Sequence, residues 1–221
     1  MKKIIISFLF LMAVSLSAFA QGFYLDIGLG IGVKEWTSIE DHDMADVFKL
    51  SGSKLQEENI RFLTGSLKSG YGPFSKMPLY FVIEITGILD HYFDDYSTDV
   101  DMSYYFSSIT CGPGFVFYPV PFIQLGSSIG YSWTGVSAVM RTDLVSIESG
   151  FEWMSGLAWN TSLAIDVGAL WKGRNSVLLG VNYCYINNIF KSTLTNDAKW
   201  NSSMITVFLK YAFRKKPQSL F

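Results

Sequence analysis

Residues 201–213 alternate between apolar and polar side chains, and this pattern constrains the fold more than any other feature of the sequence. Every second residue from Ile205 is apolar or aromatic: Ile205, Val207, Leu209, Tyr211 and Phe213. A two-residue period gives a β-strand one apolar face and one polar face. Residues 23–34 repeat the pattern with the same parity, and they are long enough for the tilted strand of ~9–11 residues that crosses a hydrocarbon layer.

Six further segments alternate in the same way, with apolar side chains at odd positions. They are residues 60–71, 79–89, 103–117, 123–133, 153–167 and 177–185. Short connections near residues 72–77, 118–121 and 172–175 alternate with long ones at about 35–59, 90–102, 134–152 and 186–200. This asymmetry is typical of membrane barrels with short periplasmic turns and long outer loops. We therefore predict an all-β fold, an eight-stranded antiparallel up-and-down transmembrane β-barrel, with ten strands if residues 35–59 or 134–152 contain another hairpin.

The N-terminus has the layout of a secretory signal. Lys2 and Lys3 precede an apolar stretch, and the small-residue site Ala18-Phe19-Ala20 follows it. We expect three parts: a signal peptide at 1–20, an outer-membrane β-barrel at 21–213 and a short basic C-terminal tail at 214–221. Export with this fold predicts that the protein lies in the cell outer membrane.

The charge content argues against two other classes of protein. A net charge of −2 gives no sign of nucleic-acid binding, which needs concentrated Lys and Arg. A secreted lipocalin-like barrel would expose many charges to water. Only 16% of this chain is charged, and the polar strand faces are mostly Gly, Ser, Thr and Asn. This composition favours the membrane barrel over the soluble one.

Six charged residues on the strands have even numbers and are therefore expected inside the barrel: Asp26, Lys34, Lys68, Glu84, Asp166 and Lys210. The interior of an eight-stranded barrel is just filled by side chains, and charges held there must be paired. Because the first and last strands must be neighbours for closure, we predict an ion pair between Asp26 and Lys210. The set forms either a structural polar plug, the interpretation we favour, or the lining of a narrow gated pore.

The two cysteines, Cys111 and Cys184, would be oxidised in the periplasm if they were close together. In this register they lie on opposite faces of strands that are not neighbours. We therefore predict two free thiols.

Taken together, the signal, the eight alternating segments, the loop asymmetry and the terminal aromatic residue resemble the small OmpA-, OmpX- and OmpW-like outer-membrane barrels. The resemblance implies contact with outer-membrane lipid and an assembly signal at Tyr211 and Phe213 that the outer-membrane assembly machinery reads. It also implies loops that can bind an extracellular ligand. The tail after Phe213 departs from the class, since these barrels usually end at the aromatic residue, and it leaves Phe221 as the alternative signal.

Enzymatic function was weighed at two clusters. The expected second loop contains His91 and the acidic residues Asp90, Asp94, Asp95, Asp99 and Asp101. Outer-membrane proteases of the omptin type use Asp and His at the barrel rim. The matching acidic pair on an opposite strand is not evident here, nor is the Ser and His of a lipid A deacylase. His42 lies in another acidic loop. We interpret both clusters as solvated loop tips, with weak divalent-cation binding as a minor alternative.

The sequence thus predicts a non-enzymatic outer-membrane barrel with no catalytic, cofactor or metal site and a structural or surface-interaction role. The alternative is a narrow channel or conduit for small solutes, hydrophobic ones included, and a rim-sited hydrolase is less favoured. Residues 44–50 have helical spacing of apolar side chains and are expected to cap the barrel mouth or to dock a partner.

Overall fold

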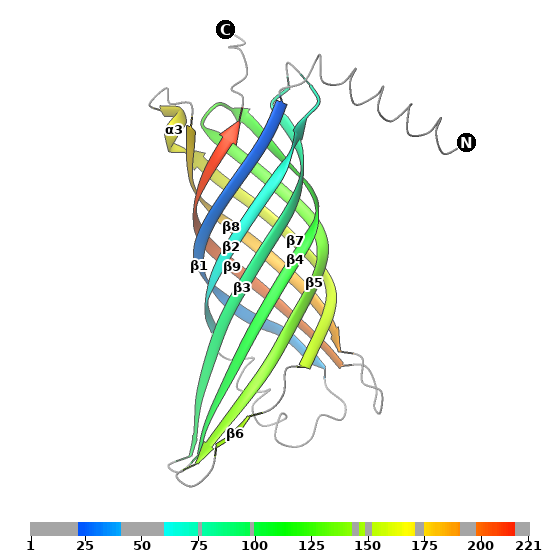
Figure 1. Ribbon diagram of the computed structural model, residues 1–221, viewed down its shortest axis with the longest axis vertical. Coiled ribbons are helices and arrows are strands. Elements are labelled where there is room, and N and C mark those ends of the chain that lie inside the picture. Colours follow the sequence, from blue (N-terminus) through cyan, green and yellow to red (C-terminus); the bar gives the residue numbers. More distant parts are fainter. Residues whose placement is uncertain are drawn as a thin grey trace, which may run out of the picture.

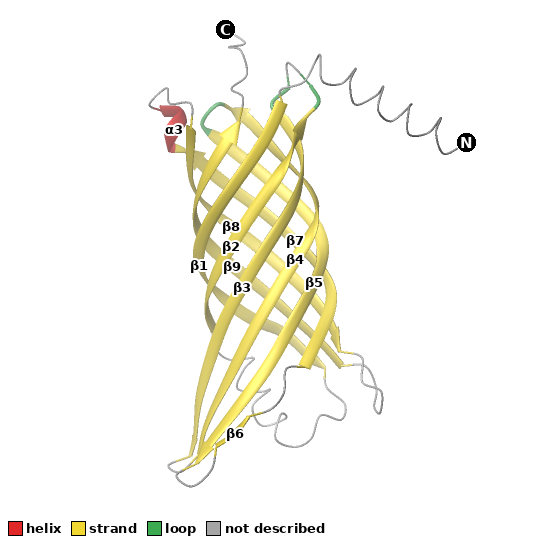
Figure 2. Ribbon diagram, in the orientation of Figure 1, coloured by secondary structure: helices red, strands yellow, loops and turns green. Residues whose placement is uncertain are grey.

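A computed structural model of the chain describes residues 22–40, 60–74, 77–97, 100–142, 146–148, 152–170, 175–190 and 198–214. Nearly all of these residues form β-strands (Figure 2). In chain order the elements are β1 (Gly22–Glu40), β2 (Ile60–Gly72), β3 (Leu79–Ser97), β4 (Val100–Val120), β5 (Ile123–Thr142), β6 (Ser146–Glu148), β7 (Glu152–Asp166), α3 (Val167–Leu170), β8 (Asn175–Phe190) and β9 (Ala198–Arg214).

The strands close into a barrel (Figure 1). Their order is β4-β3-β2-β1-β9-β8-β7-β5, every pairing is antiparallel, and β4 also pairs with β5, which joins the two ends of the sheet. The short β6 pairs only with β5. The prediction of eight antiparallel strands is therefore confirmed. The extra strand within residues 134–152 is β6, which pairs with the end of β5 and does not add a ninth strand to the barrel wall. Residues 41–59, the other place considered for a hairpin, lie outside the described residues.

Residue parity is preserved around the whole barrel. Leu29, for example, pairs with Gly65 on one side and with Leu209 on the other. Odd residues therefore share one face, where large apolar side chains are 36–74% exposed. Even residues point inward, as side chains in adjacent positions of a strand must. The alternation predicted from the sequence is confirmed.

The strands at one end of the barrel are longer than the alternation predicted. Residues 90–102 were expected to be a loop, but β3 continues to Ser97, β4 begins at Val100, and Asp95 pairs with Asp101. Likewise β5 extends to Thr142 into the expected loop at 134–152. Aromatic and β-branched residues favour β-strands even where neither face of the strand contacts lipid. The apolar alternation therefore underestimated the length of these strands.

Two smaller expectations concern the other end. The sixth strand was expected to include Val167, but the ladder between β7 and β8 ends at the pair Asp166–Leu178, and the chain then forms the helical turn α3. The turn expected near residues 172–175 and the amphipathic segment 44–50 lie outside the described residues, apart from Asn175. None of the described helical residues form a helix long and apolar enough to cross a membrane.

Both cysteines are free thiols. Cys111 lies on β4 and is partly exposed, whereas Cys184 lies on β8 and is buried. Since β4 pairs with β3 and β5, the two strands are not neighbours. The prediction from the register is confirmed.

Candidate functional site

An aromatic layer fills the barrel at its terminal end, by which we mean the end where β1 begins and β9 finishes. Tyr24, Tyr80 and Tyr118 are buried there. The ring centroid of Tyr80 lies 5.0 Å from that of Tyr24 and 6.3 Å from that of Tyr118. The amide nitrogen of Gln124 donates hydrogen bonds to the hydroxyls of Tyr24 at 2.7 Å and of Tyr118 at 2.8 Å. This layer closes the terminal end because its rings pack and its polar groups are held within the barrel.

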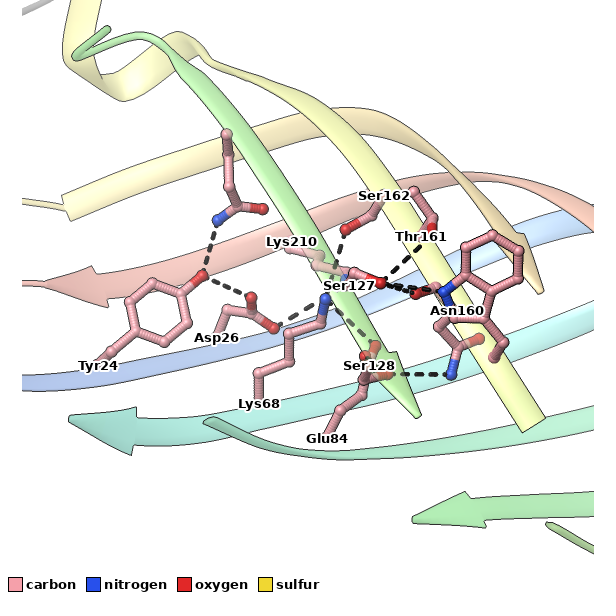
Figure 3. A network of polar contacts seen from close by, with 12 residues as sticks. Tyr24, Asp26, Lys68, Glu84, Ser127, Ser128, Asn160, Thr161, Ser162 and Lys210 are labelled. Carbon is pink, nitrogen blue, oxygen red and sulfur yellow. Dashed lines mark hydrogen bonds and ion pairs between the residues drawn. The ribbon is translucent and has the colours of Figure 1, made fainter. Parts of the chain in front are cut away.

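A charged network lies next to the aromatic layer, deeper in the barrel (Figure 3). Lys68 and Glu84 are direct cross-strand partners on β2 and β3, and Lys68 Nζ lies 3.3 Å from Glu84 Oε1. The Ser128 hydroxyl donates to Glu84 Oε2 at 2.6 Å, and Lys68 Nζ donates to Ser162 Oγ at 3.4 Å. Four strands thus supply one connected set of contacts, as a charge buried in a barrel requires.

The second ion pair joins the first and last barrel strands. Lys210 Nζ lies 3.9 Å from Asp26 Oδ1, and Asp26 Oδ2 accepts a hydrogen bond of 2.6 Å from the Tyr24 hydroxyl. Lys210 Nζ also lies 4.4 Å from the centroid of the Phe208 ring. Gly28 is the direct cross-strand partner of Lys210, and a Cβ atom there would overlap the Lys210 side chain. The glycine therefore leaves room for the lysine to reach Asp26.

Towards the other end, which we call the loop end, a third ion pair crosses the barrel. Lys34 Nζ donates to Asp90 Oδ2 at 2.7 Å and lies 4.6 Å from the centroid of the Phe106 ring. The prediction that Asp90 lies in a solvated loop is wrong, because Asp90 is a buried residue of β3. Its even number continues the inward parity of residues 80–88, and this was the signal that would have identified it.

Neutral hydrogen bonds fill the space between these ion pairs. The hydroxyls of Ser108 and Thr134 lie 2.9 Å apart, and Asn188 Nδ2 donates to Thr134 Oγ1 at 3.1 Å. Beside them, Phe62, Ile88, Ala158, Cys184, Ile186 and Met204 form an apolar cluster inside the barrel. Polar and apolar side chains together occupy the interior.

The six charged side chains expected inside the barrel, and Asp90 with them, are only 0–6% exposed, whereas the inward-facing Thr64, Ser66 and Asn182 are partly exposed. A water-filled passage beside the charged side chains would leave their surfaces accessible to water. The interior of this barrel is filled by side chains. Most of its buried polar groups have a partner within the protein, but nine buried side-chain oxygens of the described residues, Asp26 Oδ1, Asp90 Oδ1 and Gln124 Oε1 among them, accept no hydrogen bond.

The structure places all six charged residues expected inside the barrel in buried positions. Four of them form the pairs Asp26–Lys210 and Lys68–Glu84, and the first of these is the pair expected from the sequence. Lys34 pairs with Asp90, which was not in the expected set. Asp166 is buried near the terminal end of β7. Sequence reasoning also missed Tyr24 and Gln124, although both have the even numbers of inward residues.

The remaining candidate residues lie on the outer face or at the barrel ends. Tyr211 and Phe213 lie at the end of β9 with ring centroids 4.7 Å apart. His91 belongs to β3, not to a loop, and its exposed ring stacks on Tyr105 at 4.5 Å. Among the described residues, no three His, Cys, Asp or Glu side chains are grouped so that they could hold a metal ion. His42 lies outside the described residues.

Comparison with known proteins was informative only at the level of structure. No protein-family model and no curated protein matches the sequence. The chain resembles Ail of Yersinia pestis, solved in complex with the heparin analogue sucrose octasulfate, at 14% identity over 87% of this chain and 99% of Ail, with a TM-score of 0.52. OprG of Pseudomonas aeruginosa aligns at 12% identity over 87% of this chain and 96% of OprG, with a TM-score of 0.48. The identities are low enough that the likeness concerns the fold alone.

Proposed function

We propose that this chain, which has the fold of the small outer-membrane β-barrels, is an integral outer-membrane protein with a closed interior. Its role is structural, with a surface interaction made by the sheet that extends from its loop end. The packed interior is the observation that carries the proposal, since it favours this role over passage of solutes. The proposal involves no catalytic step.

The outer face supports a location within a lipid bilayer. Its apolar side chains form a belt around the barrel, and the exposed aromatic residues Phe23, Tyr71 and Phe213 lie near the terminal end. Aromatic side chains are enriched at both lipid–water boundaries of membrane barrels. In this proposal the terminal end faces the periplasm, residues 1–20 direct export, and Tyr211 and Phe213 form the signal for the assembly machinery.

The packed interior leads to a prediction for conduction. In planar lipid bilayers the protein is expected to give no steady single-channel current, because the Tyr24, Tyr80 and Tyr118 layer and the paired charges leave no water-filled path. A large porin with an aqueous channel in the same bilayers is the positive control. Steady open currents would support the alternative, a narrow channel for small solutes, and would contradict the closed barrel.

A sheet projecting from the loop end supports the surface role (Figure 1). The ladder between β2 and β3 ends at the pair Phe62–Asp90, whereas β3 and β4 remain paired up to Ser97 and Val100. The 21 residues of β4 are about twice the ~9–11 needed to cross the hydrocarbon layer. The excess length places the tip of the β3–β4 hairpin well beyond the barrel wall, on the cell exterior in this proposal.

The composition of the hairpin tip favours a cationic partner. Residues 92–106 contain four aspartates and neither Lys nor Arg, and Arg141 on β5 is the direct partner of only one of them, Asp101. Long-range electrostatics at the hairpin therefore attract cations and repel polyanions. The ligand in the Ail complex is a polyanion. We therefore propose that this chain engages basic segments of its partners and not sulfated sugars.

The hairpin can be shortened to test this role. His91 and Tyr105 are direct cross-strand partners, so residues 92–104 can be replaced by an Asn-Gly turn, which favours a tight hairpin. The shortened barrel is expected to fold, because the removed segment lies beyond the β2–β3 ladder. The pairs lost from the barrel sheet are those that residues 100–104 make with β5. Vesicle-embedded wild-type protein should retain a polylysine probe at low salt, and the shortened protein should not. Equal retention would contradict the surface role of the hairpin.

A further inference from the structure

A groove crosses the outer face of the barrel near the loop end. It has a volume of about 1080 Å³ and runs over β9, β1, β2, β3 and β4. Its walls include the outward residues Ile31, Val33, Leu63, Leu89, Ile205 and Val207. Ligand pockets for drug-sized molecules measure roughly 300–1,000 Å³, so this groove accommodates an occupant larger than a typical small metabolite.

The floor of the groove lies where the β2–β3 ladder ends and β3 continues, paired with β4 alone. Phe62 and Asp90 form the last pair of the β2–β3 ladder and contribute to the groove. The Asp90 side chain is completely buried, yet the residue as a whole is 6% exposed. The exposed part is therefore main chain, at the point where β3 continues beyond β2.

Arg61 and His91 line this end of the groove. Arg61 and His91 each lie one position beyond the Phe62–Asp90 pair on their strands, so both point outward and are neighbours. His91 stacks on Tyr105, which holds its ring against the groove. Among the described residues, Arg61 has no carboxylate partner. A guanidinium group beside an apolar surface is costly in lipid unless an anion compensates its charge.

From this arrangement we infer that the groove binds a phosphate-bearing lipid of the outer leaflet with several acyl chains. The chains lie over the apolar rows on β9, β1, β2 and β3, and the phosphate is held between Arg61 and His91. Arginine binds phosphate through two parallel hydrogen bonds, which gives both orientation and affinity. This inference rests on the proposed outer-membrane location, since only there does the loop end of the groove face the outer leaflet.

Native mass spectrometry of the detergent-solubilised protein tests the inference, with diphosphoryl lipid A as the probe. Wild-type protein is expected to retain lipid A in preference to phosphatidylglycerol, which supplies a phosphate but only two chains, and to phosphatidylcholine, whose headgroup has no net charge. Arg61→Gln should weaken lipid A retention about tenfold, the loss expected for one charge-assisted contact. Arg61→Lys keeps the charge and should weaken retention by only about two- to threefold.

The matched control is Leu163→Gln, which changes an exposed apolar residue on β7, away from the groove, and should leave retention unchanged. Thermal unfolding of each variant reports whether the barrel is intact. Equal retention of lipid A by wild type and by intact Arg61→Gln would overturn the inference, as would equal retention of phosphatidylglycerol and lipid A by the wild type. Neither result concerns the closed interior or the hairpin. A failure of the lipid-binding inference is therefore distinguishable from a failure of the proposed function.

Discussion

Replacing Glu84 with alanine is expected to lower the free energy of unfolding by about 3–5 kcal/mol, the usual cost of removing one partner from a buried ion pair. Glu84 Oε1 lies 3.3 Å from Lys68 Nζ, and Glu84 Oε2 accepts a hydrogen bond of 2.6 Å from Ser128. Without the carboxylate, Lys68 keeps only the long 3.4 Å contact with Ser162 among its described hydrogen bonds. An almost unpaired ammonium group would then lie in a barrel interior that excludes water.

Urea unfolding of the protein in lipid vesicles, followed by tryptophan fluorescence, measures this change. The control is the double variant Lys68→Met and Glu84→Leu, which removes both charges while keeping similar volumes. It is expected to recover most of the lost stability, because apolar replacements of buried ion pairs are often neutral. With Lys68→Met and Glu84→Leu as the single variants, the wild type and the double variant complete a cycle that gives the coupling free energy between the two side chains. A loss below about 1 kcal/mol for Glu84→Ala would instead indicate that water reaches Lys68 and that the interior is hydrated.

The odd or even number of a strand residue predicts which side of the barrel wall its side chain faces. A pair such as Lys68 and Glu84 lies inside because both residues have even numbers, and the same argument places Asp26 and Lys210 inside. The eight strands of the barrel wall pair residues of equal parity, as at Leu29, Gly65 and Leu209, except beyond the bulges that precede Ser38, Ser97 and Val120. Alternation and closure are therefore readable from one chain.

The alternation of apolar and polar residues does not predict the register or the length of the strands. The contact between Lys34 and Asp90 spans β1 and β3, which are separated by β2, so it depends on how far the strands are staggered. The β3–β4 hairpin continues beyond the expected loop boundary at Asp90 because its two strands pair with each other. Neither the stagger of the strands nor their length produces a two-residue period of apolar side chains in the sequence. For the same reason the groove at Arg61 and His91 required the structure, since it forms where one strand ends and its neighbour continues.

Leu29→Arg is the second substitution with a large expected effect, because it tests what surrounds the barrel. Leu29 is 74% exposed on the outer face, midway along the apolar stretch from Phe23 to Val33. An arginine at the midplane of a membrane barrel costs about 2–4 kcal/mol, and near a lipid–water boundary about 0–1 kcal/mol. The variant is therefore expected to lose about 2–4 kcal/mol of unfolding free energy in vesicles, measured by urea titration, whereas Phe23→Arg at the terminal end should lose much less. If both substitutions were equally harmless, the outer face would be in contact with water, and a soluble barrel with an unusually apolar surface would replace the membrane protein.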